Sequence, residues 1–350
     1  MASELRHDQL RQRWITISDK RGKRPSDFER MSSQRMGGSP EAINRGPCAF
    51  CPGFELVNGH ETFAIRDGEQ ADASDWRVRV IVNKYPAVSM DYGDLQPTGE
   101  GAVFDECRLP GFGSHEVVIE TPSHDLNIPE LPASHVAEVL KAYQARINWF
   151  QKDPRLKFCQ VFKNRGNRAG ASMTHSHSQL IALPVITHNK LTELDSAQEY
   201  YNEHKRCMMC DVVEHDTQSV RSRLIDENEF FITIAPFAPS FPYETWLVPK
   251  FHSSNFESIG EDEIQAMAKL LKLTLRKMDL AFGYPPYNYT LQTALLGKEH
   301  FNSSHYHWYL DIAPHLATPG GFEMGSGCYI NCMPPEKGAE FLRNVDIEPQ

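Results

Sequence analysis

Residues 161–183 read VFKNRGNRAGASMTHSHSQLIAL. The β-branched and aromatic residues before Lys163 predict a strand, and the glycines and asparagines that follow it predict a loop. The apolar run that closes the segment predicts a second strand, entered from the HSHSQ sequence. Two strands joined by a glycine-rich loop, with histidines at the junction, suggest a sheet that carries a functional site beside this loop.

The polar residues of HSHSQ are candidates for chemistry. Alternate residues of a strand share a face, so His175, His177 and Gln179 are expected to point the same way, next to the loop. Glycine lets the backbone approach a phosphate, and exposed N–H groups can bind it. Imidazole is largely neutral at cellular pH, because its unperturbed pKa is about 6.5. The segment therefore predicts phosphoryl chemistry, and a buried histidine without a catalytic role is the simpler alternative.

The second half of the chain repeats the pattern of the first. Each half has a CxxC pair, then a lone histidine eight residues after a glutamate, then an HxH run with a proline nine residues after its first histidine. These residues are Cys48, Cys51, Glu116, His124, His175, His177 and Pro184, and then Cys207, Cys210, Glu244, His252, His305, His307 and Pro314. Such self-similarity indicates a tandem duplication. We place the boundary in the polar stretch 191–203, which gives domains 1–195 and 196–350.

Each half is predicted to combine strands with one amphipathic helix. Apolar residues recur at helical spacing in 136–150 and again in 264–282, between corresponding strands. Segments rich in β-branched and aromatic residues predict four strands in each half. These strands are 76–82, 116–120, 158–163 and 179–185, and then 230–235, 244–248, 287–293 and 307–313. The predicted fold class is α+β.

Two CxxC pairs account for four of the eight cysteines. In an intracellular chain such pairs are more often metal or redox sites than disulfides. Zn²⁺ prefers thiolate and imidazole ligands, and four protein ligands make a closed structural site. We therefore predict two zinc ions per chain. Their ligands are Cys48, Cys51, His124 and His175 in one site, and Cys207, Cys210, His252 and His307 in the other, with His305 left open as the alternative to His307.

Composition narrows the classes of function. The chain has 350 residues, of which 40% are hydrophobic, and a formal net charge of −10. The negative charge argues against a non-specific nucleic-acid binder. Neither a signal sequence nor a membrane span is visible, so we expect a cytoplasmic protein. Neither nucleic acid nor a membrane is an expected partner.

The motifs resemble a known family. GASMTHSHSQ at 170–179 is similar to the HPHxQ active-site motif of the transferase branch of the histidine triad superfamily. From CAFC at 48–51 to GCYIN at 327–331, the chain resembles the galactose-1-phosphate uridylyltransferase family, and most closely its plant-type branch with ADP-glucose phosphorylase activity. That branch shares Ser176 in place of proline and a GGFExGxGCYIN signature, here 320–331. The resemblance implies a homodimer of chains whose two histidine triad-like halves form one continuous antiparallel sheet flanked by helices.

The resemblance also implies a ping-pong reaction. His177 is expected to attack the α-phosphorus of a nucleotide sugar, with loss of a sugar 1-phosphate. Phosphate or another sugar 1-phosphate then accepts the nucleotide. Gln179 is expected to bind the transferred phosphoryl group. Further substrate contacts are expected at Asn83, Asn164, Gly170, Ser172, Gly321, Glu323 and Gly325.

Other functions compete with a phosphorylase of ADP-glucose. The first is a UDP-glucose:hexose-1-phosphate uridylyltransferase of galactose metabolism. It stays an alternative because the sequence does not identify the base, the sugar, the second acceptor or the physiological direction of the reaction. The second is a non-catalytic, zinc-stabilised nucleotide-binding protein, against which His177 and Gln179 argue. The third is a nucleotide hydrolase of the smaller histidine triad type, which usually needs neither duplication nor two zinc sites. The second half is expected to lack catalysis, because no glutamine matches Gln179 there.

Overall fold

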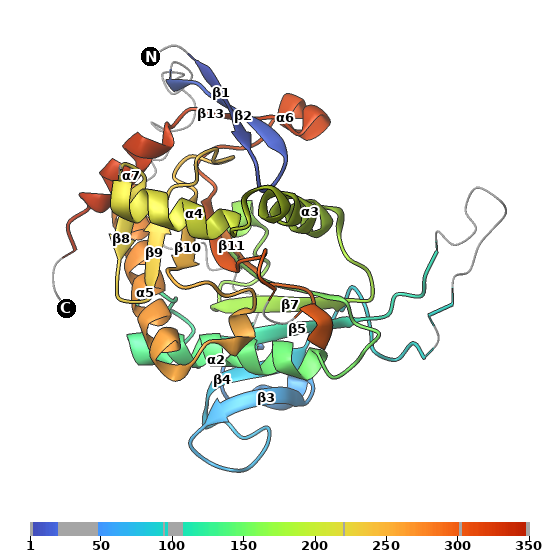
Figure 1. The fold of residues 1–350 in the computed structure, drawn as a ribbon. Coiled ribbons are helices and arrows are strands. Elements are labelled where there is room, and N and C mark those ends of the chain that lie inside the picture. Colours follow the sequence, from blue (N-terminus) through green and yellow to red (C-terminus); the bar gives the residue numbers. More distant parts are fainter. Residues whose placement is uncertain are drawn as a thin grey trace.

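One large antiparallel sheet runs through both halves of the chain (Figure 1). The computed structural model describes residues 3–19, 48–93, 95–96, 108–219, 221–300 and 303–347, and ten strands among them form this sheet. The strands are β3 (Glu61–Arg66), β4 (Trp76–Val82), β5 (Ser114–Ile119), β6 (Phe158–Arg165), β7 (His177–Leu183), β8 (Leu224–Glu227), β9 (Phe231–Ile234), β10 (Thr245–Pro249), β11 (Tyr287–Gln292) and β12 (Tyr309–Pro314).

The two halves repeat one topology. From its outer edge to the centre, the first half runs β3-β4-β5-β7-β6 and the second runs β8-β9-β10-β12-β11. At the centre β6 pairs with β11, and Asn164 lies opposite Asn288. Helix α2 (Ala133–Phe150) follows β5, and helix α5 (Glu261–Phe282) follows β10. This repetition is what a tandem duplication predicts, and the fold class expected from the sequence is confirmed.

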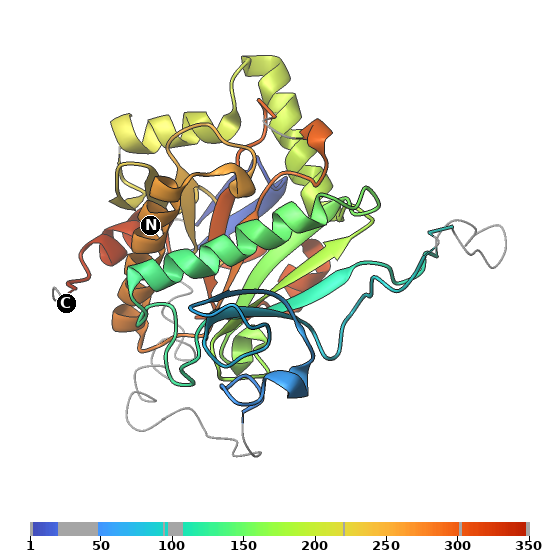
Figure 2. The ribbon, with the colours of Figure 1, turned by 90° about the horizontal axis from the view of Figure 1, so that it is seen from below.

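Helices α2 and α5 pack against each other on one face of the sheet, and Figure 2 shows α2 lying along it. Their apolar side chains share one core with Val118, Leu180 and Leu310 of the strands. Successive residues of a strand point to opposite faces, so the residues next to these core positions face away from the two helices. Gln179 and its cross-strand partner Val117 therefore lie on the face that α2 and α5 do not cover.

Further elements belong to the second half and to the chain ends. Helix α4 (Met208–Glu214) and strands β9 and β10 share a smaller core, which includes Met209, Ile232 and Trp246. A second sheet has the order β1-β2-β13, with β13 parallel to β2 (Figure 1). These elements are β1 (Glu4–Asp8), β2 (Arg13–Ile17), α3 (His188–His204), α4 (Met208–Glu214), α6 (Gly321–Ser326), β13 (Tyr329–Asn331) and α7 (Pro335–Arg343). Within the described ranges, no helix has the length and apolarity needed to cross a membrane.

The polar stretch in which we placed the domain boundary is helical. Residues 191–203 lie within α3. The buried face of this helix includes Lys190 and Glu193, whose side chains are 3.2 Å apart. Because charged residues occupy positions that are usually apolar, the helix has no clear hydrophobic periodicity in the sequence.

Candidate active site and metal-ligand clusters

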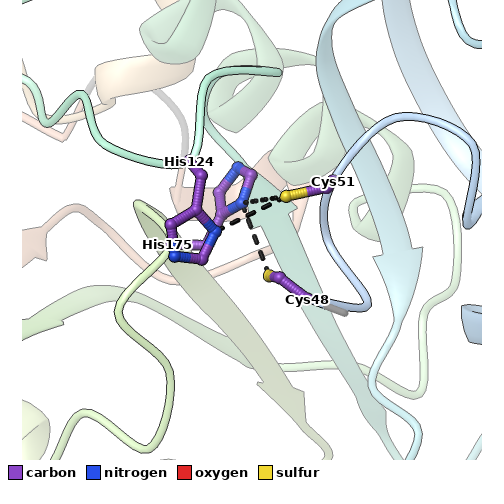
Figure 3. Close-up of side chains that lie close together, drawn as sticks. All are labelled: Cys48, Cys51, His124 and His175. Atoms are coloured by element: carbon purple, nitrogen blue, oxygen red, sulfur yellow. Dashed lines mark hydrogen bonds between the residues drawn. The ribbon is translucent and has the colours of Figure 1, made fainter. Parts of the chain in front are cut away.

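The first CxxC pair lies beside both histidines that are predicted to share its metal (Figure 3). Cys51 Sγ is 3.5 Å from His124 Nδ1 and 3.7 Å from His175 Nδ1, and Cys48 Sγ is 3.6 Å from His175 Nδ1. A turn in which the Cys51 N–H donates to Cys48 O brings the two sulfurs together. A tetrahedral zinc ion, bonded at about 2.3 Å to sulfur and about 2.0–2.1 Å to nitrogen, holds such atoms about 3.5 Å apart. The four side chains therefore fit a metal ion of this kind.

The second CxxC pair forms a cluster of the same composition. Cys210 Sγ lies 3.4 Å from His252 Nδ1 and 3.5 Å from His307 Nδ1, and Cys207 Sγ lies 3.9 Å from His307 Nδ1. His305 instead contacts a serine hydroxyl, 2.9 Å from its Nδ1. In each cluster all ligand atoms lie within 4.8 Å of one another. The structure thus brings both expected ligand sets together and has His307, rather than His305, in the second.

The histidines of both clusters are oriented through their other ring nitrogen. His175 Nε2–H donates to the backbone oxygen of Thr121 at 2.7 Å, and His307 Nε2–H donates to that of Pro249 at 3.2 Å. Such bonds leave the lone pair on Nδ1 and aim it at the metal position. The backbone of the sheet and its loops therefore sets the geometry of each cluster.

His177, the expected nucleophile, is held by one ring nitrogen. Its Nδ1–H donates to the backbone oxygen of His175 at 2.8 Å, so the neutral ring carries its lone pair on Nε2. None of the hydrogen bonds among the described residues engages Nε2. Burial lowers the pKa of His177, which favours the neutral ring. The ring of Phe50, between the two cysteines, is centred 5.5 Å from the His177 ring. This arrangement offers an oriented, unbonded nitrogen, as a nucleophile requires.

Gln179 belongs to a polar group that includes a residue absent from our sequence-based predictions. Its Oε1 is 2.8 Å from His115 Nε2 and 3.5 Å from Asn83 Nδ2. His115 lies on β5, two residues from Val117, the cross-strand partner of Gln179. A histidine in a strand next to the HSHSQ strand is the only signal the sequence held for it. Asn83, expected to contact the nucleotide, is thus adjacent to Gln179.

A buried ion pair supports the HSHSQ segment from the helix-covered side. Lys163 Nζ donates to Glu120 Oε2 at 2.5 Å, to Ser176 Oγ at 3.0 Å and to His177 O at 3.1 Å. The Ser176 hydroxyl donates to Glu120 Oε2 at 2.6 Å. Burial opposes the ionisation of Glu120, but Lys163 and the hydroxyls outweigh it and hold its pKa below the usual value. Ser176 thus links the segment to a charged pair through a hydroxyl that proline lacks.

The glycine-rich loop is held by the second half of the chain. Gly166 and Gly170 have φ angles of 81° and 87°, which glycine adopts without strain. Asn288 Nδ2 donates to Asn164 Oδ1 at 2.7 Å and to a loop carbonyl at 2.8 Å. Ser172 is exposed at the end of the loop. The loop residues predicted to bind substrate therefore surround the entry to β7.

The C-terminal signature follows a segment that contacts the glycine-rich loop, where Arg168 donates to Thr318 Oγ1 at 3.1 Å. Gly321, Glu323 and Gly325 belong to α6, and no residue of α6 is buried. Glu323 Oε2 accepts the N–H of the residue that precedes this helix, at 2.8 Å. None of the hydrogen bonds, ion pairs or ring contacts of the described residues joins α6 to His177. Within one chain, the described contacts do not bring these three residues to the expected nucleophile.

A cavity of about 970 Å³ opens on the same face of the sheet as Gln179. Asn164, Asn288, Arg11 and Asp311 are among its lining residues, and neither His177 nor Gln179 lines it. The cavity therefore lies beside the expected catalytic residues rather than over them.

The second half has different residues at the positions that match the catalytic ones. The structure places His307, not His305, at the position of His175, so the HxH runs of the two halves are offset by two residues from the match made on the sequence. Tyr309 therefore stands in place of His177, and Asp311 in place of Gln179. Arg11, from the turn between β1 and β2, donates to Asp311 Oδ2 at 2.5 Å and lies 5.8 Å from the centre of the Tyr309 ring. A phenol and a paired carboxylate thus replace the imidazole and the amide. The expectation that the second half is not catalytic stays a prediction.

Comparisons with known proteins agree with this geometry. The family model for the N-terminal domain of galactose-1-phosphate uridyl transferase matches residues 1–187, and that for the C-terminal domain matches residues 193–325. An ADP-glucose phosphorylase of Arabidopsis thaliana is 38% identical over 347 residues, 98% of this chain and 93% of the relative. A galactose-1-phosphate uridylyltransferase of Thermotoga maritima is 25% identical and covers 99% of each chain.

Solved structures give the same result. A crystal structure of an Arabidopsis thaliana ADP-glucose phosphorylase with bound ADP-glucose matches with a TM-score of 0.83 and 35% identity, over 99% of this chain and 100% of that one. A uridylyltransferase structure matches with a TM-score of 0.74 and 26% identity, over 98% of each chain. Together the two family models cover both halves of the chain, and each of these relatives covers at least 98% of it. The chain therefore belongs to the galactose-1-phosphate uridylyltransferase family and is a nucleotidyltransferase.

Proposed function

We propose that the chain catalyses the reaction of ADP-glucose with phosphate to give ADP and glucose 1-phosphate. First, Nε2 of His177 attacks the α-phosphorus, the bond from that phosphorus to the glucose 1-phosphate oxygen breaks, and glucose 1-phosphate leaves. Phosphate then attacks the adenylyl-histidine, the P–N bond breaks, and ADP leaves. Because glucose 1-phosphate leaves before phosphate reacts with the covalent intermediate, the kinetics are ping-pong.

The observation that carries this proposal is the hydrogen bond from His177 Nδ1 to His175 O, at 2.8 Å. It fixes the tautomer and leaves the Nε2 lone pair available for attack. Without this bond the ring could rotate or carry its hydrogen on the attacking nitrogen. The bond therefore supports a nucleophilic role for His177 more directly than the motif does.

The remaining site residues are proposed to bind parts of the substrate. Gln179 would donate to the transferred phosphoryl group, whose charge in the transition state favours fixed donors. Asn83 would contact the nucleotide, and Asn164, Gly170 and Ser172 would contact the ribose or phosphates. We assign Gly321, Glu323 and Gly325 to the sugar phosphate. Since no described bond joins α6 to His177 in one chain, this last contact is proposed to come from the second chain of the expected homodimer.

The choice of adenine over uracil rests on the relatives. The Arabidopsis ADP-glucose phosphorylases match at 35–38% identity, whereas the Thermotoga uridylyltransferase matches at 25%. The resemblance of Ser176 and of the 320–331 segment to the plant-type branch favours the same choice. Base selection would depend on hydrogen bonds to the edge of the base, because pocket shape alone rejects a smaller base weakly.

Two structural zinc ions per chain complete the proposal. The two Cys₂His₂ clusters would hold them, and four protein ligands would leave no position for substrate. Zinc would tie the cysteine loops to the sheet, and at the first cluster it would hold Phe50 against His177. The cytoplasmic location stays a prediction, as does the homodimer.

A product assay tests the proposed reaction. Purified protein is incubated with ADP-glucose or UDP-glucose, each with either phosphate or galactose 1-phosphate, and the products are followed by ³¹P NMR. We expect ADP and glucose 1-phosphate from ADP-glucose and phosphate, and parallel lines in double-reciprocal plots. Turnover confined to UDP-glucose and galactose 1-phosphate would identify a uridylyltransferase instead, and no turnover of any pair would favour a non-catalytic nucleotide-binding protein.

A further inference from the structure

The direction in which Gln179 presents its carboxamide decides what it can do. A carboxamide has an oxygen that accepts and an NH₂ group that donates, and the two ends are similar in shape. Only the NH₂ end can stabilise the negative oxygens of a transferred phosphoryl group. A residue that fixes this orientation would therefore contribute to the reaction without touching the substrate.

The hydrogen on the His115 ring can be assigned from its backbone partner. The N–H of Ala87 donates to His115 Nδ1 at 3.1 Å, and a backbone N–H can only donate. Nδ1 is therefore an acceptor, and the neutral ring carries its hydrogen on Nε2. Nε2 lies 2.8 Å from Gln179 Oε1. The ring thus donates to the oxygen of Gln179, and the opposite orientation would bring two donors face to face.

Asn83 supports the same orientation. Its Oδ1 accepts the N–H of Tyr85 at 2.9 Å, which turns its NH₂ group toward Gln179 Oε1, 3.5 Å away. Asn83 Nδ2 is also 3.1 Å from His115 Nε2. Since both nitrogens carry hydrogen in this assignment, that contact is not a hydrogen bond. Two side chains, each fixed by a backbone N–H, therefore direct hydrogens at the Gln179 oxygen.

The His115 ring is itself held in place. The residue is buried, with 8% of its surface exposed, and its backbone oxygen accepts the N–H of Asn83 at 2.8 Å. It lies diagonally across the β5–β7 pair from Gln179, a separation that long side chains can bridge. Little ring movement is available to break the bond to Gln179.

We propose that His115 is a positioning residue, which binds the oxygen of Gln179 so that the amide hydrogens face the phosphoryl group transferred to His177. The inference rests on the proposed function, because the orientation matters only if a phosphoryl group reaches His177. It assigns to β5 an indirect part in the reaction, through Gln179 on the neighbouring strand that carries the HSHSQ motif.

A double-mutant cycle tests the proposal. The rate of nucleotidyl-enzyme formation from ADP-glucose is measured under single-turnover conditions for wild type, His115→Phe, Gln179→Ala and the double variant. Loss of a fixed donor costs about 10²–10³-fold, so Gln179→Ala should fall in that range. His115→Phe should lose about 10-fold or more with little change in KM, because the donor acts in the transition state. In the Gln179→Ala background, His115→Phe should cause no further loss.

Two more variants separate positioning from structural damage. His115→Gln retains an N–H near the position of Nε2 and should recover most of the lost rate. His135→Phe removes another ring hydrogen bond of the first half, to the Glu120 backbone oxygen at 2.7 Å, and should leave the rate unchanged. Thermal melts confirm that each variant is folded.

The possible outcomes are distinct. An equal loss from His115→Phe in both backgrounds, or no loss in the wild-type background, would overturn the positioning role while leaving the proposed function intact. If wild type forms no nucleotidyl-enzyme from any nucleotide sugar, the proposed function fails and this inference fails with it.

Discussion

His177 donates through Nδ1 to the backbone oxygen of His175, a residue whose own ring belongs to the first metal-ligand cluster. The same short segment therefore supplies a proposed metal ligand and a proposed nucleophile. A metal bound to His175 would fix the main chain that orients His177, although it would not touch the substrate. The two histidines are expected to have different roles because their rings are bonded differently. His175 donates through Nε2, which leaves Nδ1 for a metal, and His177 donates through Nδ1, which leaves Nε2 for attack.

Alanine substitution of each histidine is expected to separate the two roles. His177→Ala should abolish turnover and leave metal content unchanged, since solvent does not replace a covalent nucleophile at a useful rate. His175→Ala should lower the metal content and the midpoint of thermal unfolding. Kinetics, metal analysis and thermal melts check both. Near-normal turnover in His177→Ala would contradict the mechanism, and equal metal loss in the two variants would mean that ligand and nucleophile are assigned wrongly.

The buried Lys163–Glu120 pair is expected to matter more for stability than its hydroxyl partner. Glu120→Gln leaves Lys163 buried without a counter-charge and should lower the free energy of unfolding by about 3–5 kcal/mol. Ser176→Ala keeps the ion pair and should cost about 1–2 kcal/mol. Urea denaturation measures both. Equal losses of unfolding free energy in the two variants would show that groups other than Glu120 compensate the charge of Lys163.

At the scale of elements, sequence patterns located eight of the ten strands of the large sheet. The eight predicted strands correspond to β4–β7 and β9–β12, with ends displaced by at most two residues. Five strands were not predicted: β1, β2, β3, β8 and β13. All are six residues or shorter, and all except β2 lie at a sheet edge. Helix α3 was missed for a different reason. It is buried on one face, but that face carries the charged residues Lys190 and Glu193. Burial of apolar residues is what the periodicity detects.

The site was predictable only where its residues share a local motif. The HSHSQ motif and the CxxC pairs identified His175, His177 and the cysteines, which lie together in the structure. His115 and Arg11 were not identified, because their roles depend on pairing between segments far apart in the sequence. Arg11 and Asp311 are 300 residues apart, and Gln179 and His115 are 64 apart. No spacing rule connects such positions before the strand order is known.

Arg11 is expected to attach the β1–β2 hairpin to the second half. Arg11→Met leaves Asp311 and Glu244 without their guanidinium partner and should lower the free energy of unfolding by about 3–5 kcal/mol. Turnover at low temperature should persist, because His177 lies in the other half. Arg6→Met is the matched control on the same hairpin, where the carboxylate partners are exposed, and should cost at most about 1 kcal/mol. A larger loss in Arg6→Met than in Arg11→Met would contradict this view.

At the scale of the whole molecule, a duplicated fold carries two related metal-ligand clusters and one expected catalytic centre. The halves share a continuous sheet and a common core, so the second half cannot be removed without exposing α2 and the strands beneath it. Asn288 of the second half also holds the glycine-rich loop of the first. The second half therefore supports the site of the first through Asn288, and its lack of a catalytic residue stays a prediction.

The purified protein is expected to hold about two zinc ions per chain, and chelation should lower both its thermal midpoint and its activity. Cys48→Ser should lower both the thermal midpoint and the activity, since the first cluster places Phe50 beside His177. Cys210→Ser should lower the thermal midpoint but leave most of the turnover at low temperature. Metal analysis, melts and kinetics check this set. Only trace zinc in fully active protein would contradict the structural role of the metal.

The central claim is that His177 carries a nucleotidyl group between two substrates. The most direct measurement is mass spectrometry of the protein after incubation with ADP-glucose and, separately, with UDP-glucose, followed by peptide mapping. The account predicts an AMP adduct on His177 that forms with ADP-glucose, is lost on addition of phosphate with release of ADP, and is absent from His177→Ala. An adduct on another residue, or labelling by UMP alone with discharge by galactose 1-phosphate but not by phosphate, would contradict it.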